Sequence, residues 1–152
     1  MGVRFDVDTT GMAEEIARID DMRRRAEDLT PVLTGRAQAG EGVIQEQVFD
    51  RGQSPLGDPW AGLAASTLKK RRGRSAQILV NTGKLREGIQ GIAKPHSVVF
   101  SSDKDFGAYL QTGTRHMPAR PFIPTGFDRG PIRDWADRVD DRVRRYIETG
   151  EV

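Results

Sequence analysis

Apolar residues in the first part of the chain recur at steps of three and four, which predicts an amphipathic helix over residues 12–29. A second stripe follows Thr30-Pro31, a typical helix start, and continues to Val48. We expect both stripes to face the core, with Ile16, Ile19 and Ile44 buried. The first stripe consists of Met12, Ile16, Ile19, Met22, Ala26 and Leu29, and the second of Leu33, Ala37, Gly40, Ile44 and Val48.

The middle of the chain contains shorter elements separated by turns. Residues 50–59 form a loop rich in glycine and proline, and a short helix is predicted after Trp60. Gly91–Lys94 and Ser97–Ser102 are predicted to be the two strands of a hairpin, joined at Pro95-His96. We expect the core of this part to contain Trp60, Leu63, Leu68, Leu79, Leu85, Ile89, Val98 and Phe100.

The last part of the chain begins with an extended segment. Four prolines lie within residues 113–131, which predicts a stiff, irregular arm rather than a helix. Pro131 then opens a C-terminal helix with apolar residues at helical steps. Because helices precede and follow a small antiparallel β unit, the order indicates one α+β domain over residues 1–152. Its parts are N-terminal helices (1–50), an α+β core with the arm (51–124) and a C-terminal helix (125–152).

The charge changes sign along the chain. Residues 1–50 carry 6 basic and 11 acidic residues, residues 51–100 carry 9 and 2, and residues 101–152 carry 9 of each. This polarity allows either a contact with nucleic acid or contacts between acidic and basic parts of two copies. The longest apolar run, Ile78–Val80, is too short to span a membrane, so we expect a soluble protein.

The sequence contains few residues or motifs that could catalyse a reaction. There is no cysteine and no phosphate-binding loop, nucleophile elbow or zinc-binding histidine motif. The two histidines, His96 and His116, have no nucleophile nearby in sequence. We therefore expect no catalytic residue, cofactor or metal. A small hydrolase or toxin-like enzyme that uses one of these histidines is an alternative, and it would require a histidine beside an acid in a concave pocket.

Two segments are candidates for contacts with partners. Lys69–Arg74 could follow a nucleic-acid backbone or meet an acidic protein, although the simpler explanation is the solvated end of a helix. The segment Pro118–Pro124 holds an arginine and an aromatic residue on a stiff backbone, which suits a protein interface or an edge strand. The interface candidates are Arg115, Arg120, Phe122 and Ile123, and the candidates for DNA or an acidic partner are Lys69, Lys70, Arg71, Arg72 and Arg74.

An ordered set of motifs resembles the phage virion morphogenesis family, the tail-completion proteins of tailed bacteriophages. The chain departs from the family at one motif, because Phe106, Gly107, Leu110 and Gln111 stand where the family shows Tyr-Ala-x-x-His-Gln. The resemblance covers residues 49–124. It rests on Gly57–Trp60, on Thr67-Leu68 with the basic stretch that follows, on Ile78–Leu85 with Ile89, on Gln111-x-Gly113 and on Pro118–Ile123.

This resemblance implies a structural, non-enzymatic virion protein without cofactors. It would complete the tail or join it to the head at the neck, as part of an oligomeric ring of six copies. The implied partners are other copies of the chain, neighbouring neck, connector or tail-tube proteins, and packaged DNA close by, with no membrane. The implied location is the head–tail junction of the virion, after assembly in the host cytoplasm. The acidic N-terminal part of one copy could contact the basic middle of the next, since a ring needs a heterologous interface.

A nucleic-acid-binding protein that uses residues 69–74 is the alternative from another class. Binding of this kind would weaken steeply between low and physiological ionic strength.

Overall fold

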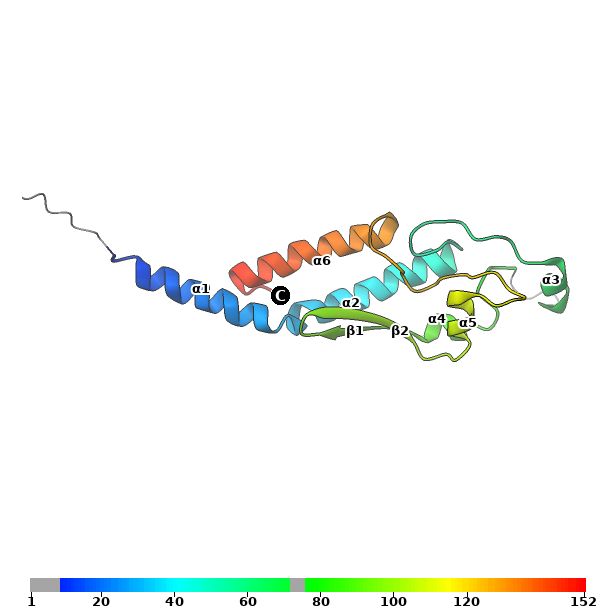
Figure 1. Ribbon diagram of the computed structural model, residues 1–152, viewed down its shortest axis with the longest axis horizontal. Coiled ribbons are helices and arrows are strands. Elements are labelled where there is room, and N and C mark those ends of the chain that lie inside the picture. Colours follow the sequence, from blue (N-terminus) through cyan, green and yellow to red (C-terminus); the bar gives the residue numbers. More distant parts are fainter. Residues whose placement is uncertain (1–8, 72–75) are drawn as a thin grey trace, which may run out of the picture.

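Three long helices form the frame of the structure, a computed structural model that describes residues 9–71 and 76–152 (Figure 1). A two-stranded antiparallel sheet and three short helices complete it, which confirms the α+β class. The elements are α1 (Met12–Glu27), α2 (Thr30–Gln45), a π-helical continuation η1 (Glu46–Asp50), α3 (Ala65–Arg71), α4 (Lys84–Glu87), β1 (Ile89–Lys94), β2 (Ser97–Ser102), α5 (Gly107–Thr112) and α6 (Gly130–Thr149).

The break between α1 and α2 lies at Asp28 and Leu29. Asp28 has extended backbone angles, and its carboxylate accepts a hydrogen bond from the N–H of Thr30 (2.8 Å), the first residue of α2. The N–H of Leu29 donates to the carbonyl of Pro95 in the hairpin turn (2.9 Å). Two helices thus form where two were predicted, and the junction between them is tied to the hairpin.

The hairpin agrees with the sequence prediction in its strands and its turn. Strand β1 begins at Ile89, two residues earlier than expected, and pairs with β2 through the turn at Pro95-His96. Gly91 lies opposite Phe100, and Ile92 lies opposite Val99. Because side chains alternate across a strand, Gly91 and Phe100 share the face that packs on α2, and Ile92 and Val99 share the opposite face.

Helix α2 lies against both the hairpin and α6, and the core forms around it. Gly40 of α2 permits this approach, because a Cβ atom there would lie 2.5 Å from Phe100 Cζ and 2.7 Å from Trp135 Cε2. The two rings meet edge to face with centroids 5.3 Å apart. The indole N–H of Trp135 donates to the carbonyl of Arg36 (2.9 Å). The buried core cluster comprises Ile44, Val48, Phe49, Leu85, Ile89, Phe122, Ile132 and Trp135.

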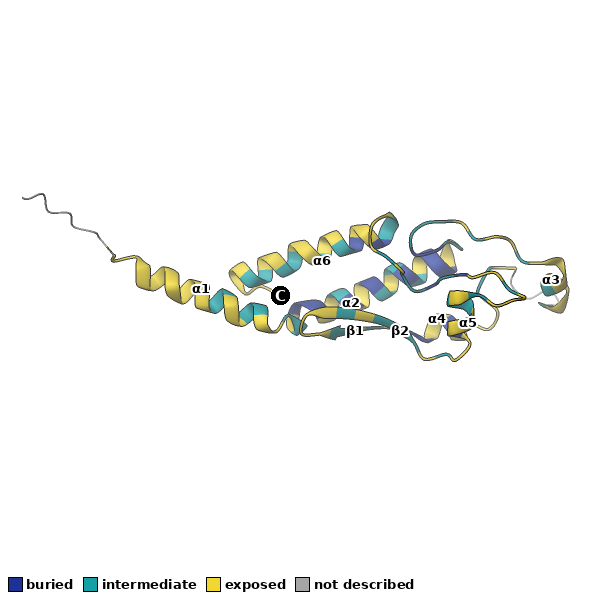
Figure 2. Ribbon diagram, in the orientation of Figure 1, coloured by how far each residue is buried: buried dark blue, intermediate teal, exposed yellow. Residues whose placement is uncertain are grey.

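The expected burial of Ile16 and Ile19 in the first apolar stripe is wrong, whereas Met22, Ala26 and Leu29 of the same stripe are partly buried. Ile16 and Ile19 are 57% and 60% exposed, because α1 extends past the C-terminal end of α6 (Figures 1 and 2). Arg25 joins α1 to the C-terminal end of α6, since its guanidinium donates to the carbonyls of Ile147 (2.8 Å) and Glu148 (3.1 Å). Leu68 is also exposed, whereas Ile44, Leu85 and Ile89 are buried as expected.

The other predicted core residues of the middle part are partly buried. Trp60, Leu79, Val98 and Phe100 pack against the core cluster. The irregular arm and the C-terminal helix lie where they were predicted. Within residues 9–71 and 76–152, no helix is long and apolar enough to cross a membrane.

Helix α2 offers a matched test of this packing. Gly40→Ala should lower the free energy of unfolding by about 1–3 kcal/mol, because the new methyl group overlaps Phe100 and Trp135. Gly35→Ala is the control in the same helix, since no atom lies within 4 Å of its added Cβ, and it should stabilise by about 0.5–1 kcal/mol. Urea unfolding of both variants measures the difference, and equal effects would contradict the packing described.

Candidate interaction surfaces

The arm is fixed to its own chain through Gln111 of α5. The Gln111 side-chain oxygen accepts hydrogen bonds from the N–H groups of Phe122 and Ile123 (both 3.1 Å), and its NH₂ group donates to the carbonyl of Ile123 (2.9 Å). The N–H of Arg120 donates to the carbonyl of Leu110 (2.7 Å). One glutamine thus supplies partners to an irregular backbone that has no neighbouring strand among the described residues.

The structure places Arg120 and Phe122 inside the chain and not at its surface. Phe122 is 1% exposed and belongs to the core cluster. The Arg120 guanidinium is also buried and donates to the carbonyls of Ala61 (3.1 Å) and Gly62 (3.3 Å). Both side chains pack against segments of their own chain in this conformation, and their role as partner contacts stays a prediction. The alternative reading of the arm, as a segment packed on its own domain, agrees with these contacts.

The other two residues of the arm remain predicted contacts. Arg115 is exposed, and its Nε donates to Nε2 of His116 (3.3 Å). Ile123 is partly buried against the core cluster. Of the four interface candidates, these two are the ones with surface available to a partner.

The basic segment divides into parts with different roles. Lys69 and Lys70 are exposed at the end of α3, as expected for contacts with a partner. Arg71 instead points back to the chain, where its Nη1 donates to the carbonyls of Gln77 (2.7 Å) and Val80 (3.2 Å). Arg72 and Arg74 lie outside the described residues. Arg71 is therefore better explained as a residue that holds residues 77–80 in place than as a ligand for DNA.

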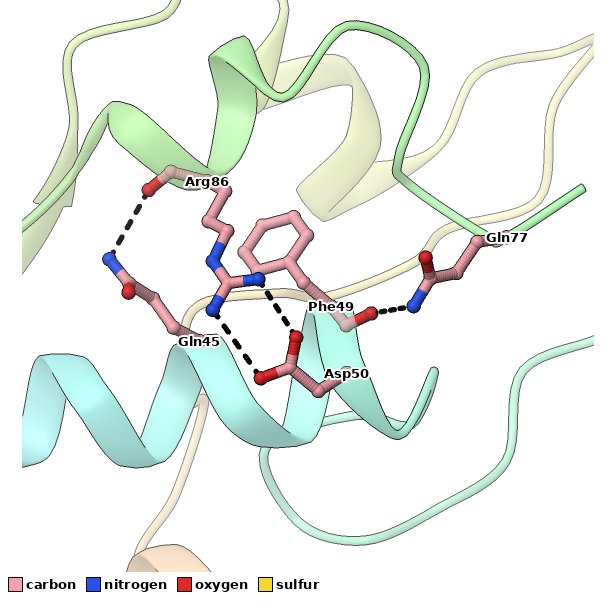
Figure 3. Close-up of polar contacts among 5 residues, drawn as sticks. All are labelled: Gln45, Phe49, Asp50, Gln77 and Arg86. Atoms are coloured by element: carbon pink, nitrogen blue, oxygen red, sulfur yellow. Dashed lines mark hydrogen bonds and ion pairs between the residues drawn. The ribbon is translucent and has the colours of Figure 1, made fainter. Parts of the chain in front are cut away.

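A polar junction joins the end of α2 to the segment around α4, and sequence reasoning missed it (Figure 3). The Arg86 guanidinium forms two hydrogen bonds with the carboxylate of Asp50 (2.8 and 3.4 Å), and Gln45 donates to the Arg86 carbonyl (3.4 Å). The side chain of Gln77 donates to the carbonyl of Phe49, which ties down the loop that Arg71 also contacts. Asp50 and Arg86 are 36 positions apart, so no periodic pattern in the sequence indicates that they form an ion pair.

A groove of about 420 Å³ opens between α3, α5 and the arm. Leu63, Leu79 and Leu110 contribute apolar surface to it, and Arg71 and His116 contribute polar groups. Three segments far apart in sequence thus form one hollow. Its mostly apolar lining suits the side chains of a protein partner.

Neither histidine lies in a recognisable catalytic arrangement. The described residues that line the groove beside His116 include no acidic residue. His96 lines a shallow hollow together with Asp140, but within the described part of the chain no hydrogen bond joins the two, and Asp140 pairs with Arg144 (4.0 Å). Among residues 9–71 and 76–152, no group of three or more His, Cys, Asp or Glu side chains could hold a metal ion.

Comparison with known proteins defines the class to which this α+β chain belongs. The model of the phage virion morphogenesis family matches residues 10–148, which span the described helices from α1 to all but the last residue of α6. The chain therefore belongs to the phage virion morphogenesis family, as its motifs indicated, and its role lies in the morphogenesis of a phage virion.

A curated protein supports this membership. The chain is similar to Mu-like prophage FluMu G protein 1 of Haemophilus influenzae, with 29% identity over 121 residues. The alignment covers 70% of this chain and 80% of the relative. No solved structure matches the chain.

The arm provides the second prediction. Phe122→Ala should destabilise the fold by about 3–5 kcal/mol, because it empties a fully buried site. Arg120→Ala should cost about 1–3 kcal/mol, because the carbonyls of Ala61 and Gly62 lose their donor. Arg115→Ala, in the exposed part of the arm, is the control and should melt like the parent. Thermal unfolding measures the effect of each variant. An unchanged melting temperature of Phe122→Ala would show that this side chain does not stabilise the core and would favour it as a partner contact.

The basic segment provides the third prediction. Arg71→Ala should lower the melting temperature, since it removes the hydrogen bonds that hold residues 77–80. Lys70→Ala removes a neighbouring exposed cation and should leave the melting temperature unchanged. Calorimetry on the two single variants compares them, and equal melting temperatures would show that Arg71 has no structural role.

Proposed function

We propose that the protein is a structural, non-enzymatic component of the head–tail junction, where it completes the tail or joins it to the head. The observation that carries this proposal is the family match, which extends over residues 10–148. The similarity to FluMu G protein 1 of a Mu-like prophage supports a role in a phage. The described contacts favour a structural role, because arginine and glutamine side chains that could serve chemistry are used to hold backbone carbonyls and N–H groups.

A ring of six copies is the assembly that we propose for this component. A ring needs two different surfaces on each copy, one for the preceding and one for the following neighbour. The strongly acidic residues 1–50 and the strongly basic residues 51–100 provide opposite charges for such a contact. Lys69, Lys70, Arg115 and Ile123 are the proposed contacts with neighbouring subunits, neck proteins or connector proteins.

Proximity to packaged DNA is part of the proposal and has one observation in its favour. A cleft of about 340 Å³ between α2 and α6 is lined by four arginines and one aspartate. Such a cluster, together with exposed Lys69 and Lys70, could face phosphate groups. A purely nucleic-acid-binding function is the second candidate, and steep loss of DNA affinity with salt would favour it. The cleft residues are Arg36, Arg138, Asp141, Arg142 and Arg145.

Removal of this chain from the phage tests its structural role in virions. Particles made without this chain should contain filled heads and separate or unfinished tails, visible by electron microscopy. Supplying the intact chain should restore joined particles, and the chain should be present in purified virions by mass spectrometry. A reconstruction of the junction then gives the number of copies. Normal particles without the chain would contradict the proposed function.

A further inference from the structure

The exposed end of α1 carries an apolar stripe that the described part of its own chain leaves uncovered. Met12, Ile16 and Ile19 are 58%, 57% and 60% exposed and lie on one face of the helix. The base of α1 is fixed, because Arg25 bonds to the end of α6 and Leu29 bonds to the hairpin turn. The first turns therefore extend beyond the rest of the described molecule with their apolar face in solvent (Figure 2).

The outer face of the hairpin carries a second uncovered apolar surface. Ile92 and Val99 are directly paired across the strands and are 47% and 37% exposed. The inner face is occupied by α2, which approaches so closely that a Cβ at Gly91 would lie 2.5 Å from the Ala37 carbonyl oxygen. The outer face is thus the side on which another element can pack.

The charges that border the two surfaces have opposite sign, with acidic residues beside the stripe of α1 and one lysine on the outer face of the hairpin. Glu15 follows Met12 by three residues and Asp20 follows Ile16 by four, so both carboxylates border the stripe of α1. Residues 12–21 contain four acidic residues and one arginine. The hairpin strands contain no acidic residue, and Lys94 lies on the same face as Ile92, two positions further along β1.

From these observations we infer that the apolar stripe of α1 packs on the outer face of the β1–β2 hairpin of a second copy of this chain. The contact joins two different surfaces, so each copy can donate α1 to one neighbour and accept α1 from another. The same chain cannot make it in the described conformation, because the hairpin turn lies at the base of α1 and the stripe lies beyond it (Figure 1). This inference rests on the proposed ring and gives it a specific interface.

Cross-linking between separate variants tests the contact, because the chain has no cysteine of its own. Ile16→Cys and Val99→Cys are produced as two proteins, mixed and treated with a short bismaleimide, so that any product joins two molecules. We expect a link between them in the purified protein at high concentration and in virions from cells that make both variants. Ala17→Cys is the matched control, exposed on the same helix but off the stripe, and it should give about tenfold less product.

Disruption of the contact gives an independent readout. Ile19→Glu and Val99→Glu should each weaken self-association by about tenfold or more in light scattering, because a carboxylate replaces apolar surface in the contact. Ala17→Glu should leave self-association unchanged. All three positions are exposed, so circular dichroism should show the parent's helix content and melting.

Three outcomes would overturn the inference. The first is a link of Ile16→Cys to itself with none to Val99→Cys, which would make a second α1 the partner. The second is a link within a chain that carries both substitutions but none between chains, which would mean that α1 folds back. The third is virions that contain the protein but show no link at these positions. Absence of the protein from virions would instead contradict the proposed function and leave a contact found in solution unaffected.

Discussion

The close approach of α2 to the hairpin and to α6 is the constraint on which the rest of the structure depends. A two-stranded sheet is barely stable in water by itself, so this hairpin needs a helix against one face. Gly40 on α2 and Gly91 on β1 remove the side chains that would hold these elements apart. The space between them is filled by the rings of Phe100 and Trp135, and the Trp135 indole also bonds to the backbone of α2. Three elements from distant parts of the sequence are thereby locked together.

The proline-rich arm extends this packed unit toward the end opposite α1. Its prolines lack N–H groups and stiffen the chain, which lowers the entropy lost on folding. The N–H groups that remain at Phe122 and Ile123 find their acceptor in Gln111, and Phe122 itself fills the core. The physical features that suggested a docking segment in the sequence, a stiff backbone with an aromatic and an arginine, therefore serve internal packing in this chain.

The sequence predicted the positions of helices and strands better than it predicted which side chains these elements bury. Periodicity located α2 and α6, and the turn residues Pro95-His96 located the hairpin, because these signals are local. Periodicity also located α1, but it shows only that one face is apolar and not which molecule covers it. The burial of Phe122 and the internal hydrogen bonds of Arg71 depend on segments that no local pattern records.

The way α1 is held has a consequence for any ring built from this chain. A heterologous contact closes into a ring only if each copy presents its two surfaces at a fixed angle. The Leu29–Pro95 hydrogen bond joins the base of α1 to the hairpin turn, and the Arg25 bonds join it to the end of α6. These hydrogen bonds therefore hold the stripe of α1 and the outer face of the hairpin in a fixed arrangement within each copy. The angle between α1 and the hairpin would set the curvature of the ring, and the residues that fix this angle lie outside the contact itself.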